Sequence, residues 1–249
     1  MELGHYHFIV MGMMYMKTMQ EVIQKFPSFE TATALVFYTA ASAERYTYSR
    51  LYEDVDKVAN GLYAHGLRAG DRVALFAPNR YEWIVAAFAV LRAGGIVVPI
   101  DVQVDDETLR YILSDSESRM VITTPSDKRR LDAVQTSSVQ TFVLANKQGQ
   151  ESKSWEALFD GEAASLPHRN AQDYAILFYT SGTTGRPKGV PLSYENIGFQ
   201  LQSVEKVGLL KAGDRLLLPL PLHHVYPLVV GLCAPLSLGN EVVFPRAIT

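Results

Sequence analysis

The sequence predicts an α/β fold. Short apolar runs alternate along the chain with segments whose apolar residues recur at helical spacing, and several of those segments end at glycine. The chain has 249 residues, of which 48% are hydrophobic and 20% are charged. That length and composition are enough to bury a sizeable core, and no internal repeat or low-complexity tract interrupts the pattern.

The first half of the chain predicts a βαβ unit followed by further strands and helices. Residues 48–66 predict a helix with Ser49 as N-cap and Gly66 as its end, because apolar residues fall on one face. The turn at Gly70 then leads into the βαβ unit. In order, the expected elements are a strand at 73–77, a helix at Tyr81–Arg92, a strand at 96–100, a helix at 106–114, a strand at Met120–Thr123, a helix at 128–135 and a strand at 141–144.

Residues 146–173 are polar and irregular, with only 155–159 periodic, and they predict a connection between two lobes. The expected division is a first α/β lobe at 1–145, a connection at 146–172 and the start of a second lobe at 173–249. In that second lobe we expect a buried strand at 175–179, a helix from a Ser193 cap to Gly208, a strand at 215–220, a helix at 226–238 and a strand at 242–244.

The most informative stretch is 179–190, which reads Tyr-Thr-Ser-Gly-Thr-Thr-Gly-Arg-Pro-Lys-Gly-Val. Its glycines let main-chain N–H groups approach a ligand, its hydroxyls add donors, and Lys188 supplies a compact cation. These are the groups that bind phosphate. The P-loop of nucleotide hydrolases is excluded, because Pro187 stands where that motif needs glycine and Gly189 follows the lysine.

Composition excludes some classes of partner and site. A net charge of -3 gives no basic footprint for nucleic acid. The single cysteine, Cys233, cannot form an intrachain disulfide, and its apolar neighbours predict a buried structural role. The apolar stretches 8–16 and 225–238 are too short or too broken by proline and glycine to span a bilayer, while peripheral membrane contact stays open.

Residues 179–190 resemble the signature loop of the adenylate-forming, or AMP-binding, superfamily, whose pattern is Y/F-T-S-G-S/T-T-G-x-P-K-G-V. Two further stretches support the resemblance. Residues 91–101 are similar to its L-K-A-G-G-x-x-V-P-I-D motif, and residues 218–232 are similar to its P-L-x-H-x-x-G motif. The His-His-Val-Tyr-Pro form of the latter looks most like long-chain fatty acyl-CoA ligases. The resemblance covers the N-terminal part of the large domain, which implies mixed, mostly parallel sheets flanked by helices.

The resemblance also implies an activity and the residues that carry it. Such ligases use ATP with Mg²⁺ to activate a fatty acid and then transfer it to coenzyme A, here in the cytoplasm. It places His224 beside the acyl-adenylate and Lys188 at the departing phosphates, as the two catalytic candidates, and no metal ligand in this chain. The phosphate-binding residues that it implies are Thr180, Ser181, Gly182, Thr183, Thr184, Gly185 and Lys188.

The nature of the acid and the activity of this segment stay open. Residues 218–238 contain no Asp or Glu, which disfavours an acid with a free amine, because a buried ammonium needs a carboxylate partner. An aryl acid shares the chemistry and remains an alternative. The family's later Y-G-x-T-E and T-G-D motifs are not found before residue 249, so we expect this segment to be inactive alone. A natural short nucleotide-binding or partner-binding relative is the other alternative.

Overall fold

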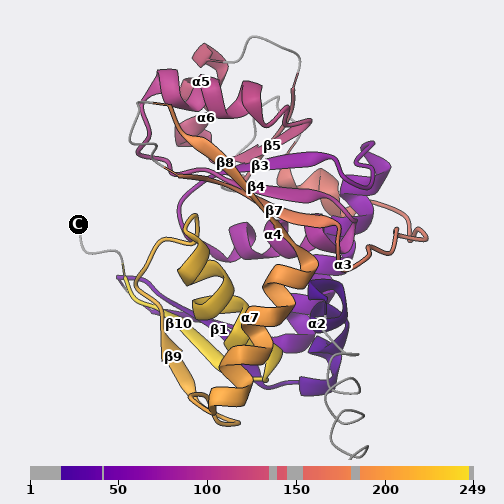
Figure 1. Ribbon diagram of the computed structural model, residues 1–249, viewed down its shortest axis with the longest axis vertical. Helices are drawn as coiled ribbons and strands as arrows, with labels where there is room; N and C mark the ends of the chain where they lie inside the picture. Colours follow the sequence, from indigo (N-terminus) through magenta and orange to yellow (C-terminus); the bar gives the residue numbers. More distant parts are fainter. Residues whose placement is uncertain (1–17, 41, 135–138, 145–153, 181–185, 247–249) are drawn as a thin grey trace, which may run out of the picture.

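The computed structural model describes residues 18–40, 42–134, 139–144, 154–180 and 186–246. It contains two β-sheets with helices between and around them (Figure 1). The six-stranded sheet lies in the upper half of Figure 1, and the four-stranded sheet, with β1, β9 and β10, lies below it. The α/β class and the mostly parallel sheets expected from the sequence are therefore confirmed.

The larger sheet has the strand order β6-β5-β3-β4-β7-β8. Its strands are parallel except for β8, which pairs antiparallel with β7. The three central strands β5, β3 and β4 are short and almost wholly buried, as expected for a parallel sheet covered on both faces. Their bounds are Arg72–Phe76 for β3, Ile96–Pro99 for β4, Met120–Thr123 for β5, Gln140–Val143 for β6, Tyr174–Thr180 for β7 and Lys188–Ser193 for β8.

Helices cover both faces of this sheet. Along β3, Val73 and Leu75 face the core that contains α3 (Tyr48–Ala64) and α4 (Tyr81–Arg92). The alternate residues Ala74 and Phe76 face α5 (Asp106–Asp115) and α6 (Pro125–Val134). This alternation follows from the two-residue period of a strand. The same α3–α4 layer also contacts the smaller sheet, since residues of β1 and β10 belong to its core cluster.

The smaller sheet joins the two ends of the described chain. Its order is β2-β1-β10-β9, with β1 parallel to β10 and β10 parallel to β9. Sheet membership therefore does not follow the lobe ranges expected from sequence, because β1 pairs with β10 and β7 joins the larger sheet. The remaining elements are α2 Met19–Lys25, η1 Phe26–Phe29, β1 Thr33–Tyr38, β2 Ala43–Thr47, η2 Trp155–Phe159, α7 Tyr194–Val207, β9 Arg215–Leu217, η3 Pro227–Cys233, α8 Ala234–Ser237 and β10 Glu241–Phe244.

Three local expectations need correction. Thr47, not Ser49, caps α3 by accepting from the Arg50 N–H, while the Ser49 hydroxyl donates to the Glu30 carbonyl. The strand expected at 215–220 ends at Leu217. The helix expected at 226–238 begins as a π-helix, in which the Ala234 N–H donates to the Val229 carbonyl. Pro235 explains that widening, because it lacks the N–H that an α-helix would direct at Gly231.

Burial agrees with the prediction for Cys233, which is 1% exposed and is therefore a core residue. Within the described ranges, no helix combines the length and hydropathy needed to cross a membrane.

Candidate functional site

The two stems of the signature stretch form an antiparallel β-hairpin. Thr180 is the last residue of β7, Lys188 is the first residue of β8, and the two are direct partners in the strand register. Both are exposed, so a hydroxyl and an ammonium group stand side by side at the open end of the hairpin. The other expected phosphate-binding residues, Ser181, Gly182, Thr183, Thr184 and Gly185, lie outside the described residues.

The stems rest on one face of α5. The Tyr179 hydroxyl donates to Asp115 Oδ2 at 2.7 Å, and the Tyr111 hydroxyl donates to Asp115 Oδ1 at 3.2 Å. Beyond the loop, the Arg186 guanidinium lies over the Tyr111 ring, 5.5 Å from its centroid. Burial and the neighbouring Asp115 carboxylate raise the pKa of Tyr179, which keeps its hydroxyl protonated as a donor. Both stems are thus anchored to the same helix.

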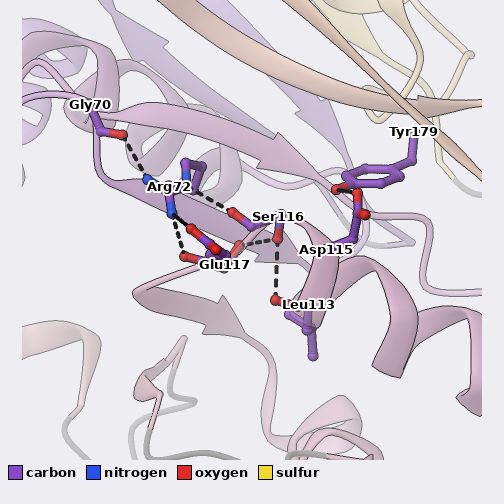
Figure 2. Close-up of polar contacts among 8 residues, drawn as sticks. Gly70, Arg72, Leu113, Asp115, Ser116, Glu117 and Tyr179 are labelled. Carbon is purple, nitrogen blue, oxygen red and sulfur yellow. Dashed lines mark hydrogen bonds and ion pairs between the residues drawn. The ribbon is translucent and has the colours of Figure 1, made fainter.

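Asp115 in turn has a fixed position, because Arg72 binds the turn that ends α5 (Figure 2). The Arg72 Nε donates to the Ser116 carbonyl at 2.8 Å, and its Nη2 donates to the carbonyl and to Oε2 of Glu117 at 3.1 and 2.9 Å. A third group, Nη1, donates to the Gly70 carbonyl at 3.3 Å. These bonds connect the C-terminus of α5 to the start of β3, so the anchor of the hairpin belongs to the sheet framework.

His224 lies on the segment that follows β9. Its side chain is exposed, and the ring of His223 lies beside it with the centroids 4.3 Å apart. His223 Nε2 is 3.6 Å from Asp101 Oδ2, just beyond the carboxyl end of β4. Burial lowers the pKa of His223 and His224 lowers it further, against the opposing effect of the Asp101 charge. His223 therefore links the histidine segment to the larger sheet.

These groups gather at one edge of the six-stranded sheet. Thr180 ends β7 and Asp101 follows β4, and these two strands are parallel neighbours. In open α/β sheets, ligands bind outside the carboxyl ends of the strands. No polar contact among the described residues joins His224 directly to Thr180 or Lys188, so the two parts of the site share this edge through the sheet and through the contact of His223 with Asp101.

A groove of about 910 Å³ opens beside the histidine segment. One wall comes from α7 and the end of β8, and the other comes from residues 225–230. Its apolar lining consists of Leu192, Ile197, Phe199, Val225, Tyr226, Val229 and Val230. Glu195 and Lys206 on α7 also line it. Both lie outside residues 218–238, whose lack of carboxylates is the argument from sequence against an acid with an amine. In the sequence, the signal for Glu195 and Lys206 was the helical spacing of residues along α7.

The hairpin offers a cation and a hydroxyl to an anionic ligand. Lys188 has no ion-pair partner among the described residues, so its charge is available to an anion. The described part of the chain also holds no group of three or more His, Cys, Asp or Glu side chains arranged to bind a metal. A cation and a hydroxyl at the end of a hairpin suit phosphate oxygens.

The sheet is mostly parallel, and the hairpin presents a cation and a hydroxyl at its carboxyl edge, where α/β folds bind their ligands. Comparison with known proteins identifies the family. The family model described as "AMP-binding enzyme" matches residues 22–249. The chain belongs to this family, as its signature stretch predicts.

Relatives with curated names are CoA ligases. A probable CoA ligase of Humulus lupulus is 35% identical over 81% of this chain and 39% of its own length. A sulfoacetate–CoA ligase of Cupriavidus necator is 31% identical over 87% and 45% of the two chains, and a long-chain-fatty-acid–CoA ligase of Mycobacterium bovis is 34% identical over 71% and 31%. The chain thus spans less than half the length of these relatives, whose names differ in the acid.

A solved structure shows the same fold. The inhibitor-bound N-terminal domain of FACL13 from Mycobacterium tuberculosis superposes with a TM-score of 0.80 at 28% identity, covering 93% of this chain and 58% of that one.

Proposed function

We propose that the complete polypeptide containing this chain joins a fatty acid, or another carboxylic acid with an apolar tail, to coenzyme A. The carboxylate attacks the α-phosphate of ATP, which gives acyl-AMP and releases pyrophosphate. The thiol of coenzyme A then attacks the acyl carbon and AMP leaves. Activation is needed because a carboxylate has no leaving group that a thiol can displace. The protein mainly positions the reactants and stabilises charge.

The observation that carries the choice of acid is the apolar groove beside His224. Val225 and Tyr226, which follow His224 directly, are part of its lining, together with Val229 and Val230 one helical turn later. Its volume is in the range of small-molecule sites, and its wall is mainly apolar. An acid whose carboxylate lies near His224 would direct an alkyl tail along this wall.

Glu195 supports a second candidate, an acid that also carries an amine. Its carboxylate lies in the first turn of α7 on the groove wall, where it is able to pair with an ammonium group. The two candidates respond differently to Glu195→Gln. Use of a fatty acid is expected to survive the substitution, whereas use of an amine-bearing acid is expected to fall with it.

At the phosphate end, we assign Lys188 and Thr180 to the β- and γ-phosphates of ATP. The two side chains leave adjacent, hydrogen-bonded strands, so their spacing is set by the hairpin. Lys188 would neutralise charge that accumulates on pyrophosphate as it leaves, which is stabilisation specific to the transition state. Mg²⁺ would enter with ATP, and coenzyme A would bind after adenylation.

The test is acid-dependent ATP–pyrophosphate exchange by the complete polypeptide, with acids from acetate to palmitate and a set of amino acids. Lys188→Ala is expected to slow exchange by about 100-fold, the usual cost of removing one charge-stabilising donor. Lys57→Ala, which removes an exposed lysine from α3, is the matched control and should not change the rate. Exchange driven best by amino acids would overturn the fatty-acid assignment, and an unchanged Lys188→Ala rate would overturn the phosphate assignment.

A further inference from the structure

Asn79 holds the segment that carries both histidines, although it is far from that segment in sequence. Asn79 follows β3, more than 140 residues before this segment in sequence. Its Nδ2 donates to the Leu220 carbonyl at 2.9 Å, and its Oδ1 accepts from the Leu222 N–H at 2.9 Å. A single amide therefore binds the backbone on both sides of Pro221. An asparagine amide suits this role, since it offers one acceptor and two donors in fixed geometry.

The bound segment has few other supports. Leu222 is fully buried, which fixes its depth, and the His224 N–H donates to the Pro221 carbonyl at 3.4 Å, a long bond. Leu220, Val225 and Tyr226 are all largely exposed. The Leu228 N–H also donates to the His224 carbonyl at 3.2 Å, so the position of this segment depends on a few polar contacts to its backbone.

The second polar contact acts one residue further on. Asp101 Oδ2 lies 3.6 Å from His223 Nε2, while Asp101 Oδ1 accepts from the Gln103 N–H at 2.9 Å. The carboxylate is therefore itself oriented by the turn that follows β4. Asn79 and Asp101 follow neighbouring parallel strands, β3 and β4, so both contacts arise from the carboxyl edge of the same sheet.

We propose that Asn79 is a positioning residue for His224, acting through the backbone of residues 220–222 and together with the Asp101–His223 contact. The role in the reaction rests on the proposed function, in which His224 lies beside the reacting acid. Asn79 fixes the position of the histidine segment at the sheet edge that also carries the hairpin of Thr180 and Lys188. Neither bond of Asn79 involves substrate, so it is not itself a catalytic residue.

The titration of the histidines tests the contact without any enzymatic activity. The pKa values of His223 and His224 are measured by NMR on this chain labelled at histidine, with assignment by single His→Gln variants. Asn79→Ala is expected to raise the pKa of His223 towards its ordinary value, because burial is the main cause that lowers it. Asp101→Asn is expected to shift the same pKa downwards, because it removes the charge that opposes that effect.

Asn60→Ala is the matched control for a loss of stability. Asn60 is another asparagine that bridges two segments, more deeply buried than Asn79, since its Nδ2 donates to the Asp56 carbonyl and its Oδ1 accepts from the Ala164 N–H, both at 2.8 Å. It is expected to lower the urea midpoint while both histidine titrations stay as in the wild type. Asn79→Ser, whose hydroxyl reaches at most one of the two backbone groups, is measured alongside in case Asn79→Ala does not fold.

Unchanged histidine titrations in folded Asn79→Ala or Asn79→Ser would overturn the proposal. In the complete polypeptide, Asn79→Ala is expected to lower acid-dependent exchange by about 10- to 100-fold, the range for a small misplacement, and Asn60→Ala is not. If no acid supports exchange but the His223 titration still shifts, the proposed function fails and the positioning of the segment by Asn79 stands. If exchange occurs and Asn79→Ala leaves it unchanged, the positioning role fails alone.

Discussion

Replacing Gln20 by leucine should destabilise the chain and loosen the connection that precedes β7. Gln20 lies on α2 and is 3% exposed. Its Nε2 donates to the carbonyls of Leu91 and Pro167, both at 3.1 Å, and its Oε1 accepts from the Arg169 N–H at 2.9 Å. One amide therefore binds the end of α4 and the polar connection at the same time. Leucine has a similar size and makes none of these bonds.

The magnitude follows from which groups lose their partner. The Leu91 carbonyl keeps two other donors, the Gly94 N–H at 3.1 Å and the Tyr194 hydroxyl at 3.2 Å. The Pro167 carbonyl and the Arg169 N–H lose the contact to Gln20 without such a substitute. An unsatisfied buried group costs about 1–3 kcal/mol, and both sites are only partly buried. We therefore expect the free energy of unfolding to fall by about 2–3 kcal/mol.

Urea denaturation followed by circular dichroism measures this change, with the slope of the transition as a check that two-state behaviour is kept. Limited proteolysis should show faster cleavage within residues 160–173. Gln172→Leu, an exposed substitution in the same connection, is the control and should behave as the wild type. A Gln20→Leu midpoint equal to that of the wild type, with unchanged cleavage, would refute the assignment of stability to this amide.

Two further predictions concern a hydrogen bond of the hairpin and a buried thiol. Tyr179→Phe removes the hydroxyl bond to Asp115, which is worth about 1 kcal/mol. Amide exchange at Gly189 and Val190, which pair with β7, should therefore accelerate by about fivefold. An unchanged rate would mean that α5 does not hold the hairpin. Burial raises the pKa of the Cys233 thiol from 9.0 to about 12, so the unfolded state releases its proton first and stability should fall as pH rises from 9 towards 12. The fall of the urea midpoint with pH should be smaller in Cys233→Ala than in the wild type. An equal fall would mean that the pH dependence comes wholly from the buried tyrosines.

Elements with a local signal could be predicted from sequence. The bounds of α4 and β5 agree with expectation, and Ser193 and Gly208 cap α7 as predicted, because helical spacing, caps and short apolar runs lie within one segment. The strands β1 and β2 were not predicted. Besides β2, β1 pairs with β10, some 200 residues later, and no local pattern specifies this second pairing.

The same distinction applies to the site. Lys188 and Thr180 could be chosen from the motif, and in the structure they pair across the hairpin. Asp115, Asn79 and Glu195 could not, since each is an ordinary polar residue until the fold brings it beside the hairpin, the histidine segment or the groove. Asn79 reads from sequence as a turn residue. Its bonds cross more than 140 residues, and only the packing of the two sheets creates them.

That packing explains how two parts of a site on different sheets keep one geometry. The hairpin consists of β7 and β8 of the larger sheet, whereas the histidine segment follows β9 of the smaller one. Any sliding between the sheets would break the contacts of Asn79 and Asp101. The layer between them opposes sliding, because ten residues of α4 are buried and the helix is apolar nearly all round. A close-packed layer of this kind has no low-energy displaced state, so the rigidity of the edge is a property of the α3–α4 core.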